Sequence, residues 1–293
     1  MDDRVDLHIH SDRSSDGDYS PEHIVDLARK SDLRAIAISD HDTVDAYPET
    51  IRYGEEKGVE IIPSLELTTL FEGREFHLLC PFIDWKSDVL GKLVKEVAER
   101  RRHEARDRVE KLQNLGFDIS WEEVLHASDP FPPLGVTIAQ LILNKAEKNK
   151  TPGFSQYLEG ENKLFAPYHF YKDYFMEGKP ASVTRRNVDL LDVLDKVLLS
   201  GGVPVIAHPG AYFQSAKKED LVRLKERGLK GLEVYSSYHD DAQKSAYKFI
   251  AEELDLVPTV GSDFHGSIKP HIHFGELEEG GYWMVEELKK RRP

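Results

Sequence analysis

Near its start the chain reads Val5-Asp6-Leu7-His8-Ile9-His10, and the loop that follows contains Ser14-Ser15-Asp16-Gly17. Successive side chains of a β-strand point to opposite faces, so Asp6, His8 and His10 are predicted on one face and the apolar residues on the other. Two imidazoles at a strand end, with a carboxylate in the next loop, are typical of a metal-binding site. This stretch therefore predicts a strand with a metal centre at its end.

Later stretches repeat the arrangement, with an apolar run followed by polar residues that can bind metal. Ala35-Ile36-Ala37-Ile38 is a continuous apolar run, as in a buried parallel strand, and it leads into Ser39-Asp40-His41-Asp42. Helices are predicted between the runs, beginning with one that starts at Ser20-Pro21-Glu22. The strands are predicted at residues 5–10, 35–38, 59–63, 76–80, 203–207, 231–235 and 257–260.

This alternation of strands and helices predicts an α/β fold with parallel strands that close into a barrel. In α/β barrels the functional residues gather at the C-terminal ends of the strands. The polar stretches of this chain follow its predicted strands. We therefore expect them to converge on one site.

Residues 88–184 interrupt this pattern. Apolar residues from Val89 to Leu112 have helical spacing, Gly116 is a suitable stop, and further helices are predicted at 121–125 and 137–148. The run Arg100-Arg101-Arg102 lies among glutamates and is interpreted as a solvated, ion-paired helix face. The sequence thus predicts a barrel from residues 1–87 and 185–293, with a helical insertion of 88–184 near its mouth.

Composition narrows the possible partners. The net charge of −14 argues against a protein that coats an extended nucleic-acid duplex, which needs a basic surface. A phosphorylated substrate would need local cations, such as metals or arginine, in this acidic protein. The single cysteine, Cys80, ends an apolar run and is interpreted as a buried structural thiol. Without a signal-like or membrane-spanning apolar run, we expect a cytoplasmic protein with no membrane partner.

The candidate metal ligands number nine, which is too many for one tetrahedral zinc ion. They suit two or three divalent ions that share carboxylates, and imidazole with carboxylate but no thiolate fits Mn, Zn or Fe. A lone His77 in an apolar strand would ordinarily be a core or surface residue. It is a candidate ligand because the chain contains the other candidate ligands as well. The candidates are His8, His10, Asp16, His41, Glu66, His77, His208, Asp263 and His265. By default His23, His103, His126, His169 and His239 are interpreted as non-ligands.

Such a multinuclear site makes hydroxide from bound water at neutral pH and holds the attacking and leaving oxygens of a displacement at phosphorus. The mechanism inferred from these residues is direct hydrolysis by metal-bound hydroxide. Two alternatives remain open. The same cluster could hydrolyse an amide or ester bond, or the chain could be a non-catalytic module that metal stabilises.

Several motifs resemble those of the PHP (polymerase and histidinol phosphatase) superfamily, and among its members the chain is similar to stand-alone metal-dependent phosphoesterases with a helical insertion. The resemblance implies a distorted (β/α)7 barrel that holds up to three metals. It also implies small phosphorylated substrates, including nucleotide 3′,5′-bisphosphates and short 5′-phosphorylated oligonucleotides. The motifs are His8-Ile9-His10, Ser15-Asp16-Gly17, Ser39-Asp40-His41-Asp42-Thr43, Ala207-His208-Pro209-Gly210 and Gly261-Ser262-Asp263-Phe264-His265.

The resemblance further implies roles for the candidate ligands. His10 or Asp263 would contact the bridging hydroxide, and His208 or His265 would lie near the leaving oxygen. The implied ligand sets are His8, His10, Glu66 and Asp263 for one metal, Glu66, His77 and His208 for a second, and Asp16, His41 and His265 for a third.

The chain departs from these relatives in its insertion. They often have a stretch like Gly-x-Ile-x-Arg-Pro-His, whose basic residues meet the substrate phosphate, whereas residues 135–140 of this chain contain no arginine or histidine. The position after His208-Pro209-Gly210, often basic in relatives, is Ala211. We expect Arg13, Arg185 or Arg186 to replace the missing phosphate contact, or else to be solvated surface residues.

Overall fold

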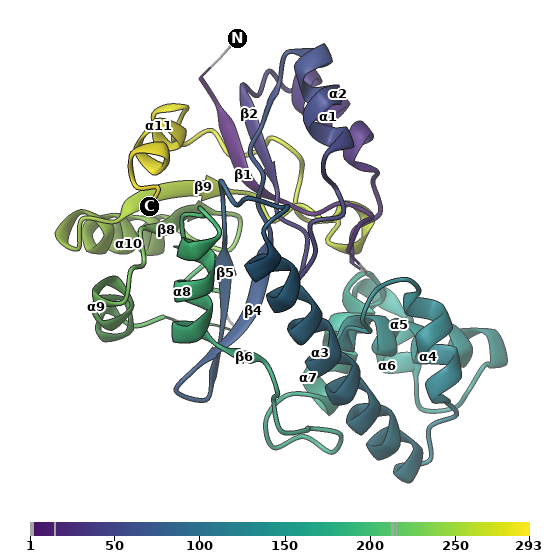
Figure 1. The fold of residues 1–293 in the computed structure, drawn as a ribbon. Coiled ribbons are helices and arrows are strands. Elements are labelled where there is room, and N and C mark those ends of the chain that lie inside the picture. Colours follow the sequence, from purple (N-terminus) through teal and green to yellow (C-terminus); the bar gives the residue numbers. More distant parts are fainter. Residues whose placement is uncertain (1–2, 15, 212–213, 215) are drawn as a thin grey trace. The chain divides into compact units, whose positions relative to one another are not determined.

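The computed structural model describes residues 3–14, 16–211, 214 and 216–293 (Figure 1). Ser15 of the Ser15-Asp16-Gly17 motif lies outside these residues. The chain forms two compact units, one of residues 1–95 and 188–293 and the other of residues 96–187. Within the described residues, no helix is both long and apolar enough to cross a bilayer.

The first unit contains two β-sheets. A three-stranded parallel sheet has the order β1 (Val5–Ile9), β2 (Ala35–Ile38) and β3 (Glu60–Ile61). The order of the six-stranded sheet is β6 (Val188–Asp189), β4 (Glu66–Phe71), β5 (Arg74–Leu79), β7 (Val205–Ile206), β8 (Gly231–Ser236) and β9 (Val257–Gly261). Two isolated parallel bridges, Ile9 with Phe264 and His41 with Glu66, connect the two sheets.

The mixed α/β class is as predicted, but the strands are not all parallel. β5 runs antiparallel to both of its neighbours, β4 and β7. The reason is the tight turn between Phe71 and Arg74, which joins β4 and β5 as a hairpin and so reverses the chain. β4 itself was not predicted, since Thr68 and Thr69 break the apolar pattern of that stretch, yet both of these side chains are buried.

Helices cover the sheets of the first unit. Ser20 caps α1, as predicted, because its side chain accepts a hydrogen bond from the backbone N–H of His23. α8 packs on β4 and β6, whereas α10 packs on β8 and β9. The helices of this unit are α1 (Pro21–Lys30), α2 (Glu49–Lys57), α8 (Leu190–Leu199), α9 (Lys218–Glu226), α10 (Asp241–Glu253), α11 (Trp283–Lys290) and the short 3-10 helix η2 (Gly266–Ile268).

The two faces of β2 are both buried, as its continuous apolar run predicted. Ala35 and Ala37 belong to one apolar cluster and Ile36 and Ile38 to another. β1 is less regular than strict alternation predicts: Ile9 joins the second cluster, whereas Val5 and Leu7 join the first, and the pairing register shifts between Asp6 and Ile9. Cys80 is fully buried, which raises the pKa of its thiol and supports a structural role.

The second unit is helical around its own apolar core. Core side chains such as Leu112, Ile142 and Phe170 come from three different helices. Arg100 pairs with Glu96 one turn away, in agreement with the predicted ion-paired face. α3 (Asp88–Asn114) begins in the first unit and continues into this one, followed by α4 (Trp121–Ser128), α5 (Gly135–Asn149), α6 (Ser155–Leu158), η1 (Gly160–Phe165) and α7 (Ala166–Tyr174).

Candidate metal centre

The sheets bring all nine predicted ligands into one cluster in the first unit. His8 and His77 lie within strands, Glu66 is the first residue of β4, and the others lie in loops that follow strands. The two loop residues His208 and Asp263 have φ angles of 23° and 58°, which non-glycine residues seldom adopt. Such backbone conformations are often found where a side chain must be held for function.

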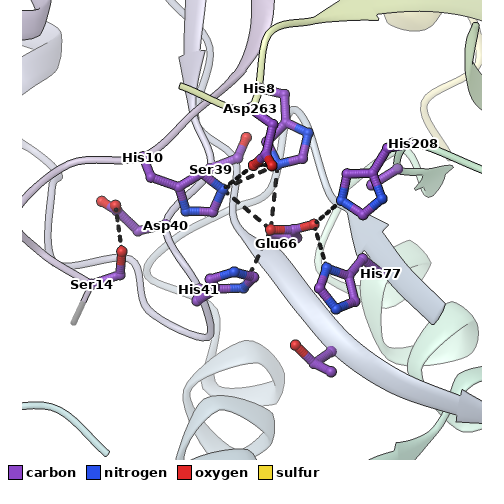
Figure 2. A network of polar contacts seen from close by, with 12 residues as sticks. His8, His10, Ser14, Ser39, Asp40, His41, Glu66, His77, His208 and Asp263 are labelled. Atoms are coloured by element: carbon purple, nitrogen blue, oxygen red, sulfur yellow. Dashed lines mark hydrogen bonds and ion pairs between the residues drawn. The ribbon is translucent and has the colours of Figure 1, made fainter. Parts of the chain in front are cut away.

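Glu66 lies at the centre of the cluster (Figure 2). Its Oε1 atom is 2.9 Å from Nδ1 of His77 and 3.1 Å from Nε2 of His208. Its Oε2 atom is 3.3 Å from Nε2 of His8, 3.2 Å from Nε2 of His10 and 3.2 Å from Nδ1 of His41. The two oxygens of one buried carboxylate thus face different histidines, which is the arrangement of a group that can bridge two metal ions.

Four ligand atoms form the first group: Nε2 of His8, Nε2 of His10, Oε2 of Glu66 and Oδ1 of Asp263. The two imidazole nitrogens are 3.1 Å apart, and each lies between 3.1 and 3.3 Å from both carboxylate oxygens. A tetrahedron with ligands about 2.0 Å from its centre has edges of about 3.3 Å. The spacing therefore fits a divalent metal ion among these four atoms.

A second group lies around Asp16. Its Oδ2 atom is 3.5 Å from Nε2 of His41 and 3.4 Å from Nε2 of His265. His10 completes this group, because one ligand atom from each of the four residues lies within 4.8 Å of the others. His41 also belongs to a third group with Glu66 and His77.

Buried polar atoms without hydrogen bonds support metal binding. Within the described part of the chain, Nδ1 of His10, Nδ1 of His41, Oε2 of Glu66 and Nε2 of His265 are buried and have no hydrogen-bond partner. Native proteins rarely leave such atoms unsatisfied. The residues present therefore fit a group of divalent ions, which these nitrogen and oxygen donors would satisfy.

The carboxylates of the cluster are ionised and ready to act as ligands. Burial alone would raise the pKa of Glu66, but the facing imidazoles of His41, His8 and His77 hold that pKa well below its usual range. The pKa of Asp16 is low for the same reason, with His41 and His265 nearby. Each carboxylate can therefore bind a cation without first losing a proton.

One important residue was not predicted. Oε1 of Glu233 lies 3.0 Å from Nδ1 of His8, and its Oε2 accepts a hydrogen bond of 2.6 Å from the backbone N–H of His208. A carboxylate on the far nitrogen of a metal-binding histidine fixes the ring orientation and the tautomer. The signal in the sequence was a lone acid inside the apolar strand that contains Leu232 and Val234.

Two further acids shape the loops that carry ligands. Oδ1 of Asp6 accepts hydrogen bonds from the backbone N–H groups of His8 and Ser262, which ties β1 to the loop after β9. Asp40 accepts hydrogen bonds from both the backbone and the side chain of Ser11. These buried carboxylates hold the ligand loops without belonging to the cluster.

The predicted substrate-binding arginines come from both units. Arg13 is in the loop after β1, where its side chain is 43% exposed and its Nε atom lies 3.6 Å from Asp12. Arg185 and Arg186 belong to the second unit, in which Arg186 forms an ion pair of 3.0 Å with Asp107. Their predicted contacts with phosphate stay predictions.

The chain matches the model of one known family. The model of the PHP domain matches residues 6–172, more than half of the chain. The chain belongs to the PHP family. The resemblance seen in its motifs is thereby confirmed, and this PHP protein is a metal-dependent hydrolase of the phosphoesterase type.

Three curated relatives are similar over most of their length. This PHP protein is 28% identical to a 5′-3′ exoribonuclease of Haemophilus influenzae, across 89% of the chain and 90% of the relative. It is also 28% identical to a phosphoribosyl 1,2-cyclic phosphate 1,2-diphosphodiesterase of Eggerthella lenta, across 92% and 97%. Its identity to a 3′,5′-nucleoside bisphosphate phosphatase of Chromobacterium violaceum is 25%, across 94% and 92%.

A solved structure shows the same architecture. The crystal structure of a Bifidobacterium adolescentis protein assigned as a metal-dependent phosphoesterase superposes with a TM-score of 0.82 at 26% identity. The alignment covers 99% of this PHP protein and 96% of that chain, so both compact units have counterparts there.

Proposed function

We propose that this PHP protein hydrolyses a phosphate ester of a small nucleotide, either a 3′,5′-bisphosphate or a short 5′-phosphorylated oligonucleotide. The observation that carries the proposal is the group formed by His8, His10, Glu66 and Asp263, whose spacing suits a divalent ion. Curated relatives act on RNA, on a cyclic phosphate and on a nucleoside bisphosphate, which all contain phosphoester bonds.

The strands of the first unit are proposed to close into a distorted (β/α)7 barrel, with residues 88–184 inserted. The bridges between Ile9 and Phe264 and between His41 and Glu66 support this closure, because they connect the two sheets through two separate pairs of residues. A closed barrel would bring the strand ends that carry ligands around a single site.

Two or three divalent ions, of Mn, Zn or Fe, are proposed to occupy the cluster. When bound, they would activate water and neutralise the charge of the phosphoryl group. His8, His10, Glu66 and Asp263 would hold one ion, and Glu66 would share a second with His77 and His208. Asp16, His41 and His265 would hold a third.

The protein's own groups prepare this chemistry. If the Nδ1–H group of His8 donates a hydrogen bond to Glu233, Nε2 of His8 carries the lone pair toward the cluster. His10 and Asp263, whose ligand atoms are 3.1 Å apart, are proposed to face the attacking oxygen. His208 and His265 are proposed to lie near the leaving oxygen. Arg13, Arg185 and Arg186 remain candidates for contact with a substrate phosphate.

The test is phosphate release by manganese-loaded protein from a nucleoside 3′,5′-bisphosphate, with a simple monophosphate measured in parallel. The proposal predicts release from the bisphosphate and its loss in His8→Ala together with bound metal. His23→Ala is the matched control, because His23 is exposed on α1. Absence of release from bisphosphates and oligonucleotides, with turnover of an acyl ester or amide, would overturn it.

A further inference from the structure

The Oδ2 atom of Asp263 accepts hydrogen bonds from two side chains that were not among the predicted site residues. The hydroxyl of Tyr238 donates to Oδ2 at 2.6 Å, and Nζ of Lys269 donates to the same atom at 2.5 Å. Oδ1 of Asp263 faces His8 and His10 instead. Asp263 thus separates the cluster on one side from an ammonium and a hydroxyl on the other.

Lys269 retains donor capacity in this position. Within the described residues its ammonium contacts Asp263 and, at 2.9 Å, the hydroxyl of Tyr238, which leaves one of its three N–H groups unused. The side chain of Lys269 is 27% exposed, whereas that of His8 is fully buried. Lys269 therefore lies at the boundary between the cluster and solvent, where an incoming ligand can reach the ammonium.

Tyr238 also contacts His208, which belongs to the implied ligand set with Glu66 and His77. The ring of Tyr238 stands edge-on to the ring of His208, with 5.4 Å between their centres. Tyr238 thus contacts residues from two of the implied ligand sets, Asp263 from one and His208 from the other. A group bound between these sets would lie close to the hydroxyl of Tyr238 and to Lys269.

Charge makes Lys269 the strongest candidate among the cations. Among the described residues it is the only lysine or arginine that forms an ion pair with Asp16, Glu66 or Asp263. Its Nζ atom lies 2.5 Å from the carboxylate of Asp263, a contact that favours the charged form of the amine. An acidic protein that binds phosphate needs such a local cation.

We propose that Lys269 recognises the phosphoryl group of the substrate, with its free N–H donated to a phosphate oxygen while Asp263 and Tyr238 hold the ammonium in place. The inference rests on the proposed function, since it adds a phosphate-binding residue to the same site. It also accounts for the lack of arginine and histidine at residues 135–140, because this cation comes from the loop after β9 instead.

The test measures the binding of inorganic phosphate to manganese-loaded protein by calorimetry, with metal content determined on the same samples. Lys269→Met is expected to weaken phosphate binding by about 10- to 100-fold, as for the loss of a charge-assisted hydrogen bond, at unchanged metal content. Lys269→Arg should recover most of the affinity because it keeps the charge. Lys290→Met is the control, since Lys290 is exposed and forms an ion pair with Glu287 on its own helix, α11.

Two results would overturn the inference. In the first, Lys269→Met binds phosphate as tightly as the unaltered protein once both are loaded to the same metal content, which would limit Lys269 to positioning Asp263. In the second, the unaltered loaded protein does not bind phosphate. Phosphate binding that depends on Lys269, without hydrolysis of any phosphoester, would instead contradict the proposed function alone.

Discussion

The carboxylate of Glu233 lies 3.0 Å from Nδ1 of His8, on the side of the ring opposite to the cluster. Both side chains are fully buried, so their contact is not weakened by solvent. We expect Glu233→Gln to weaken metal binding by about 10- to 100-fold, because the charge that orients and polarises the histidine is lost. Metal titration of the metal-free protein measures this change.

The control for this variant is Glu287→Gln, at a partly exposed residue of α11 that pairs with Lys290. It should bind metal as the unaltered protein does. Equal metal affinity in Glu233→Gln and the unaltered protein would show that His8 needs no carboxylate partner.

The two oxygens of Glu66 face different histidines, and this makes a second prediction. Glu66→Gln replaces one oxygen by an NH₂ group, which cannot bind metal. We expect it to lower the number of bound ions per chain more than Asp16→Asn, because Glu66 lies near five histidines whereas Asp16 forms ion pairs with His41 and His265. Elemental analysis after dialysis gives both numbers, and equal losses would argue against a bridging role for Glu66.

Metal removal should destabilise the protein. Ions that bind only the folded state stabilise it by about 2.7 kcal/mol when present at 100 times their dissociation constant. For a chain of this size we expect a chelator to lower the midpoint of thermal unfolding by roughly 5 to 10 °C. The shift should shrink in Glu66→Gln, and an equal shift in both proteins would place the stabilising metal elsewhere.

His239 makes a fourth prediction, on pH dependence. Its Nδ1 donates to the carbonyl of Val234 at 2.8 Å, and its Nε2 accepts from the backbone N–H of Gly210 at 2.9 Å. Both ring nitrogens are therefore in use, which agrees with the interpretation of His239 as a non-ligand. A proton on Nε2 would break the bond that holds the loop after His208.

Burial lowers the pKa of His239 and outweighs the hydrogen bond to Val234 and the charges of Glu233 and Asp240, which would raise it; Lys244 acts in the same direction as burial. Because the folded-state pKa lies below that of the unfolded chain, near 6.5, the unfolded chain gains the proton first. The free energy of unfolding should therefore fall as pH decreases from 7.5 to 5.5. The slope contributed by one histidine is at most about 1.4 kcal/mol per pH unit.

His239→Gln removes this titration and leaves the other histidines in place. Urea unfolding at both pH values should show that the unaltered protein loses stability relative to the variant as pH falls. A difference between the two proteins that stays constant with pH would mean that His239 does not favour its neutral form in the folded state.

Elements of the fold could be predicted where the hydrophobic pattern or the capping residues of a short segment determine its structure. The run from Ala35 to Ile38 gave a buried strand, and the Ser20-Pro21 pair gave the start of α1, because both signals are local. β4 was missed because its threonines resemble a loop, and their burial depends on pairing with β5. The antiparallel direction of β5 follows from that same pairing.

In the site, too, residues marked by local sequence patterns were predicted and residues defined by distant contacts were not. All nine predicted ligands come together, because each lies in or beside a short stretch that combines a strand with His, Asp or Glu. Glu233, Tyr238 and Lys269 were missed because their importance comes from neighbours that are distant in sequence. Glu233, for example, meets His8 across more than 200 positions. Only the folded arrangement reveals such partners.

The interrupted first unit has a consequence for synthesis on the ribosome. His77 leaves the ribosome about 190 residues before Asp263 does, and at about 5 to 20 residues per second this delay is about 10 to 40 s. During that time the nascent chain carries the early acids and imidazoles without their later partners, while residues 96–187, which have their own apolar core, emerge in full. We expect the helical unit to fold first and the metal-binding unit to mature only after the loop that carries Asp263 has emerged.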